Sequence, residues 1–160
     1  MADLLTSLEN LRLAQYIGES WWFPFLESIH VVASTFVVGS ILMVDLRLLG
    51  LAGSRYAISR ITRDVLPWTW GAVALSVVAG SGMFISQATH YMTNRAFQIK
   101  LVLLVLAAIN MLVFHFRTAR HIEQWDIGPV TARAVKLGGA CSLLLWIGIM
   151  LAGRWIGHLT

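Results

Sequence analysis

Charged side chains are scarce in this sequence. Only 12% of its 160 residues are Asp, Glu, Lys or Arg, whereas a soluble domain carries roughly a quarter. Because 58% of the residues are hydrophobic and the mean hydropathy is +0.72, the chain has too little charge to cover a surface that faces water. The composition argues against a soluble domain and predicts an integral membrane protein.

Cysteine and export signals are also lacking. The single cysteine, Cys141, lies inside an apolar run, so it offers neither an intramolecular disulfide nor a metal motif, and we interpret it as a small buried or lipid-facing residue. The N-terminal residues MADLLTSLENLRLAQ have no basic segment or apolar core of a cleaved signal peptide, so we expect no removal. Without repeats or linkers, residues 1–160 are predicted to form one domain.

Four apolar stretches are long enough to cross a bilayer. They run over about residues 23–51, 65–91, 96–118 and 132–159, and at 1.5 Å per residue each covers an apolar layer of about 30 Å. Before them, apolar residues recur at helical spacing among charged ones, which predicts a short interfacial helix over residues 1–20. The predicted fold class is all-α: an integral membrane four-helix bundle with a short N-terminal amphipathic helix.

The basic residues predict an orientation. A net charge of +4 and a pI near 9.8 could indicate a nucleic-acid partner, but the basic residues lie beside apolar runs, so membrane topology explains them better. The first and third connections carry most of the arginines, which predicts that these loops are cytoplasmic. We expect a multi-pass protein of the bacterial inner membrane with both termini outside, in contact with the lipid bilayer. Further assembly into a homo-oligomer or a larger membrane complex stays open.

Ionisable groups inside a span are costly, so each one is a candidate functional residue. His30 lies one to two turns into the first span, with Glu27 three residues before it on the same helix face. Lys100 lies one turn into the third span, on the same outer side of the membrane. Further candidates end the second and fourth spans on this side: His90, Arg154 and His158. Four helices thus each bring a histidine or a cation to the outer half of the bundle, which predicts a common site there.

Each candidate has a structural and a functional interpretation. His30 either donates to a carbonyl or a serine across a helix pair or ligates a metal, with haem iron as the leading choice. His158 and His90 are either hydrated interfacial residues or a second axial ligand. Lys100 either snorkels outward or pairs with a carboxylate, such as Glu27 or a haem propionate. Arg154 is either a snorkelling arginine at a helix end or a contact for a propionate.

The remaining polar residues suggest weaker sites. Asp45 is expected to pair with an arginine at the end of the third span as a structural clamp. His115 could be an inner haem ligand but lacks a partner histidine at its depth, so a second haem is not expected. Asn110 is expected to form a hydrogen bond across the bundle. A copper site is an alternative interpretation to haem, with soft ligands for Cu(I) from His90, Met83 and Met92.

Two segments carry a family resemblance. The sequence ESIHVVASTFVVGSILMVDLRLLG (residues 27–50), with its early histidine, resembles the opening helix of the HemJ/CopD-like bacterial membrane proteins. The sequence RAFQIKLVLLVLAAINMLVFH (residues 95–115) resembles their lysine-bearing helix, with Lys100 in the lysine position. The DLRLLG and LPWTW segments resemble, more closely still, an uncharacterised family of four-helix bacterial membrane proteins.

The resemblance implies haem. HemJ-like proteins bind haem b through the histidine of the first span and oxidise protoporphyrinogen, whereas CopD-like proteins are associated with copper uptake. Carried over, His30 becomes the haem ligand and Lys100 its companion. We therefore expect a haem b protein that transfers single electrons between a membrane donor such as quinol and a periplasmic partner. His158 or His90 would lie opposite His30, and Lys100 and Arg154 would neutralise the propionates. The alternative is a non-catalytic membrane subunit or a small copper or solute transport protein.

Overall fold

The structure, a computed structural model, describes residues 2–53, 55–114, 116 and 133–158. Seven α-helices lie within these ranges: α1 (Ala2–Glu9), α2 (Arg12–Glu19), α3 (Trp22–Leu49), α4 (Ile58–Ser86), α5 (Ala88–Thr93), α6 (Arg95–Val113) and α7 (Arg133–Trp155). The described residues contain no strand. The predicted all-α fold class is confirmed.

Four of the helices, α3, α4, α6 and α7, are long and apolar enough to cross a membrane, so the chain is a multi-pass membrane protein. Many of their large apolar side chains point outward, as lipid contact requires. Small residues form much of the buried interior, among them Ala33, Ala79 and Ala107. Such residues let helix backbones approach closely, which is how helices associate in lipid.

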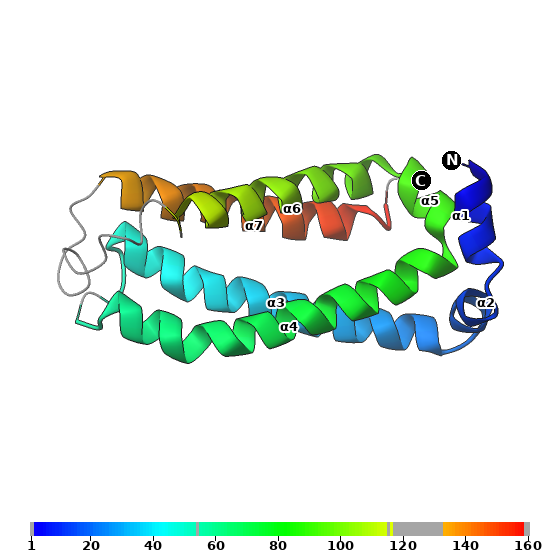
Figure 1. The fold of residues 1–160 in the computed structure, drawn as a ribbon, viewed down its shortest axis with the longest axis horizontal. Helices are drawn as coiled ribbons and strands as arrows, with labels where there is room; N and C mark the ends of the chain where they lie inside the picture. The colour runs from blue at the N-terminus through cyan, green and yellow to red at the C-terminus, as the bar shows by residue number, and fades with distance from the viewer. Residues whose placement is uncertain (1, 54, 115, 117–132, 159–160) are drawn as a thin grey trace.

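The long helices form two layers (Figure 1). Close packing joins α3 to α4, α6 to α7 and α3 to α7, whereas the described parts of α4 and α6 hardly approach each other. The short helices α1, α2 and α5 gather at one end of the bundle, which we call the cap end (Figure 1). The opposite end, where residues 50–57 connect α3 to α4, is the loop end.

Helix boundaries differ from the predicted spans where local packing decides them. The second span was expected to begin near residue 65, but α4 begins at Ile58, because Ile58 is buried against Leu48 of α3 and Val135 of α7. Pro67 consequently lies inside the helix rather than near its start. At the other end, the helix stops at Ser86 and the chain continues as the separate helix α5.

The N-terminal amphipathic segment forms two helices that cover the cap end. In α2, Ala14 and Ile17 are buried, and the helix packs on α3 and α4. The preceding helix α1 packs on α4 and α5, and the Glu9 carboxylate accepts a hydrogen bond from the Thr89 backbone N–H at 2.7 Å. The segment therefore closes one end of the bundle, while exposed side chains such as Leu4 and Leu13 face outward.

Candidate functional site

A polar cluster lies within the cap-end half of the bundle, and His30 is its centre. The His30 Nδ1 atom lies 2.8 Å from the backbone oxygen of Ser76 on α4. In a helix this oxygen also accepts from the N–H of the residue four positions on, which is Gly80. A Cβ atom at Gly80 would lie 3.1 Å from two atoms of the imidazole ring. The missing side chain at position 80 thus gives His30 access to the carbonyl.

The partners of His30 determine which ring nitrogen carries the proton. A carbonyl oxygen can only accept, so Nδ1 is protonated and donates to Ser76. On the other side of the ring, Nε2 lies 3.4 Å from the Lys100 Nζ atom of α6. An ammonium group can only donate, so Nε2 presents its lone pair to Lys100. The imidazole is therefore held in its neutral Nδ1–H form.

Two serines extend the cluster away from the cap end. The Ser34 hydroxyl, one turn after His30 on α3, lies 2.9 Å from the Ser76 hydroxyl of α4. The Ser76 hydroxyl also lies 3.2 Å from His30 Nδ1. The three side chains form a connected network across the α3–α4 interface, and such networks hold each member in one orientation.

Lys100 reaches the cluster because α6 and α7 are fixed around it. A Cβ atom at Gly153 of α7 would lie 3.5 Å from Lys100 Nζ, an ordinary van der Waals distance, so α7 packs directly beside the lysine side chain. The N-cap residue Asn94, which is buried, fixes the position of α6 along the bundle axis. Its side-chain oxygen accepts from two backbone N–H groups at the start of α6, and its Nδ2 donates to the Ile156 backbone oxygen at 3.0 Å. All four spanning helices therefore contribute to the surroundings of His30.

Aromatic rings separate the cluster from the cap end. The ring of Phe84 on α4 stacks on Phe97 of α6 with centroids 5.7 Å apart, and Tyr91 of α5 lies 5.2 Å from Phe97. Phe84 is four residues after Gly80, and Phe97 is three before Lys100, so both lie one turn closer to the cap end. Burial, with the nearby charge of Glu27, raises the pKa of Tyr91 above its ordinary value.

The other predicted site residues lie at the surface. His90, Arg154 and His158 are exposed. The His158 Nδ1 atom is 3.3 Å from the Arg154 backbone oxygen, and the His90 ring lies edge-on to Tyr91. Among the described residues, none of the three forms a hydrogen bond, ion pair or ring contact with His30 or Lys100. The structure thus brings together two of the five candidates, His30 and Lys100.

The predicted metal sites and the predicted ion pair of Lys100 can be compared with the structure. No group of three or more His, Cys, Asp or Glu that could hold a metal ion occurs in the described part of the chain. Met83 is buried, whereas His90 is exposed. Lys100 contacts His30 and makes no salt bridge to Glu27. His115 and the arginines at the end of the predicted third span, Arg117 and Arg120, lie outside the described residues.

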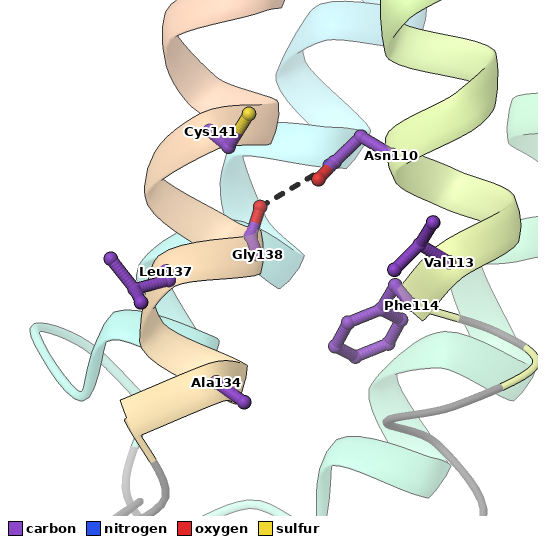
Figure 2. A pocket seen from close by; sticks show the side chains of 7 residues that line it. All are labelled: Asn110, Val113, Phe114, Ala134, Leu137, Gly138 and Cys141. Atoms are coloured by element: carbon purple, nitrogen blue, oxygen red, sulfur yellow. Dashed lines mark hydrogen bonds between the residues drawn. The ribbon is translucent and has the colours of Figure 1, made fainter.

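A pocket of about 440 Å³ lies between α6 and α7 toward the loop end (Figure 2). The Asn110 Nδ2 atom donates to the Gly138 backbone oxygen across it at 3.2 Å, which confirms the predicted hydrogen bond across the bundle. Its remaining lining residues are Val113, Phe114, Ala134, Leu137 and Cys141. This mostly apolar lining suits a hydrocarbon environment and contains no Asp, Glu, His, Lys or Arg.

Comparison with known families places the chain in one of them. The sequence profile of a family of unknown function, DUF6644, matches residues 10–159. The chain belongs to the DUF6644 family. No curated protein sequence and no solved structure matched it. In this DUF6644 protein, the arrangement around His30 is therefore the main guide to function.

Sequence reasoning missed four residues that build the cluster: Ser76, Gly80, Asn94 and Gly153. Asn94 carries a readable signal, since asparagine directly before an apolar helical run is a preferred N-cap. Gly80 and Ser76 lie four residues apart, but small residues are common in membrane helices. Only the rotation of α4 against α3 distinguishes these two from the other small residues of that helix.

Proposed function

We propose that this DUF6644 protein binds haem b at the His30–Lys100 cluster and serves in one-electron transfer. The observation that supports the proposal is the orientation of His30. Histidines that ligate metals usually donate their other ring N–H to a carbonyl or carboxylate, which fixes the tautomer and the direction of the ring. His30 has this arrangement, with Nδ1–H on the Ser76 carbonyl and the Nε2 lone pair directed into the bundle.

The surroundings of His30 fit a ligand of this kind in their donor chemistry. The missing side chain at Gly80 allows the ring its orientation, because a Cβ atom there would lie 3.1 Å from Cε1 and Nδ1. The group that faces Nε2 is the Lys100 side chain of α6, 3.4 Å away. Ligation requires Lys100 Nζ to leave Nε2, and the four-carbon stem of lysine permits that movement.

Each residue then has a defined task. His30 would hold the haem iron through Nε2, and the haem would supply the capacity to accept and release one electron. Lys100, displaced from Nε2, would place its positive charge on a propionate. Phe84 and Phe97 would shield the site from the cap end, and low solvent exposure is one of the factors that set the potential of a bound haem.

The resemblance to HemJ/CopD-like proteins points in the same direction. Its two central positions, His30 and Lys100, lie 3.4 Å apart, although 70 residues separate them in the sequence. His158 or His90 would have to move toward the cluster to become a second axial ligand, since both are exposed. We place the protein in the bacterial inner membrane with its cap end outside, where a quinol donor and a periplasmic acceptor could reach the site.

A visible spectrum tests the proposal. The protein is expressed with haem supplementation, purified in mild detergent, and recorded in the oxidised and dithionite-reduced states. We expect a Soret band that shifts on reduction, is lost in His30→Ala and persists in the exposed control His90→Ala. Absence of the band, or an unchanged spectrum in His30→Ala, would exclude His30 as a haem ligand.

A non-catalytic membrane subunit or a small copper or solute transporter is the second candidate. It is favoured by the completeness of the cluster, in which both ring nitrogens of His30 already have protein partners. A purely structural cluster needs no ligand. Elemental analysis of the purified protein distinguishes the cases: stoichiometric iron supports the haem protein, stoichiometric copper supports the copper site, and neither metal supports a structural role.

A further inference from the structure

Another ionisable residue lies inside the bundle, far from His30. Asp45 is on α3, fifteen residues after His30, and is 4% exposed. Its Oδ2 atom has no hydrogen-bond partner in the part of the chain that the structure describes. Among the described residues, no cation lies within salt-bridge distance of it. Asp45 faces α7, where the Ser142 hydroxyl is the polar group beside its carboxyl.

The charged groups described on neighbouring elements do not pair with Asp45. Arg47, two residues further on α3, donates its Nε–H to the Tyr56 backbone oxygen at 3.0 Å. On α7, the charged residue nearest to Ser142 in the sequence is Lys136, which is exposed. The loop-end turns of α4 carry three exposed charged residues: Arg60, Arg63 and Asp64. Arg60 lies 4.0 Å from Asp64. In the described part of the chain, Asp45 therefore has a hydroxyl neighbour and no neutralising charge.

The number of oxygen ligands around Asp45 indicates what it can bind. A buried carboxylate without a counter-ion is costly at any depth in a membrane, so it binds a cation or a proton. Calcium takes six to eight oxygen ligands, and magnesium near-octahedral coordination, but one carboxyl and one hydroxyl supply far fewer. A proton needs no further protein ligand, because it converts the carboxylate to a neutral acid.

We propose that Asp45 is a proton-binding site within the membrane, at the loop end of the bundle. The carboxylate and one proton form the neutral acid, with the new O–H bond at Oδ2, and release of the proton restores the carboxylate. The inference does not depend on haem at His30.

Infrared spectroscopy of the haem-free protein in lipid vesicles tests the site. At pH 7 we expect a carbonyl band of a protonated carboxyl that shifts when H₂O is replaced by D₂O. The band should be absent in Asp45→Asn and present in the matched control Asp64→Asn, which changes an exposed carboxylate of α4. A wild-type spectrum without this band, or the same band in Asp45→Asn, would overturn the proposal.

Thermal stability gives a second, independent readout. Asparagine is the neutral isostere of a protonated aspartate, so Asp45→Asn should melt within a few degrees of the wild type. A clamp between ionised Asp45 and an arginine would instead lose its charge pair, and such a loss is strongly destabilising for a buried pair. Failure of Asp45→Asn to fold would therefore also contradict the proton site. Ser142→Ala should retain the carboxyl band but change its frequency, because the neighbouring hydroxyl is removed.

Discussion

Replacing Gly80 with alanine should displace His30 from its hydrogen bond. The added Cβ atom would lie 3.1 Å from the ring atoms Cε1 and Nδ1, so the imidazole has to move by a few tenths of an ångström. That movement lengthens the 2.8 Å contact between Nδ1 and the Ser76 oxygen. Overpacking of this kind costs typically about 1–3 kcal/mol, and a hydrogen bond between membrane helices is worth about 0.6 kcal/mol.

The matched control is Gly71→Ala on the same helix, because a Cβ atom at Gly71 meets nothing within 4 Å. Both substitutions gain up to about 1 kcal/mol of helix propensity, so their difference isolates the contact with His30. We expect Gly80→Ala to be less stable than Gly71→Ala by about 1–3 kcal/mol. For a chain of this size, each kcal/mol corresponds to roughly 2–4 °C in melting temperature.

The assay is thermal unfolding in detergent, followed by the fluorescence of the seven tryptophans. A second measurement in the His30→Ala background completes a double-mutant cycle. Without the imidazole, Gly80→Ala should be as mild as Gly71→Ala. Equal melting temperatures for the two single variants, or a Gly80→Ala effect that persists without His30, would refute the proposed contact.

Two further substitutions test the framework around the site. Asn94→Ala removes the N-cap of α6 and should cost about 1 kcal/mol in a thermal scan; an unchanged melting temperature would show that the cap does not hold α6. Gly139→Leu places a Cβ atom 3.1 Å from Leu48 Cβ and 3.3 Å from the Asp45 backbone oxygen, so it should lower the melting temperature by forcing α3 and α7 apart, whereas Gly157→Leu, with nothing within 4 Å, should not.

The number and order of the spanning helices could be predicted because apolar length is a property of the chain alone. Their ends could not, because packing between distant segments sets them. Ile58 lies outside the apolar stretch predicted to begin near residue 65, yet it is helical because Leu48 and Val135 bury it. The break at Gln87 likewise follows no proline or glycine; it lets α5 meet α1, where Glu9 accepts from Thr89.

For the candidate site, the sequence could predict only how deep each residue lies in the membrane. Counting residues into each span placed His30 and Lys100 at one level, and the two side chains contact each other. The same count placed His90 and His158 on this side, but both are exposed, because depth along a helix says nothing of rotation about its axis. The orienting carbonyl of Ser76 could not be predicted, since it becomes available only where Gly80 faces α3.

His30 and Asp45, both on α3, differ in how completely their polar atoms are satisfied, and this difference supports two separate proposals. The ring nitrogens of His30 have partners on two other helices, so the proposed ligand at Nε2 would have to compete with Lys100. The propionates of haem would give the displaced lysine an anionic partner. Asp45 has an oxygen with no partner among the described residues, so a proton there would displace none of them. Ligand binding at the cap end therefore requires a side chain to move, whereas proton binding at the loop end does not.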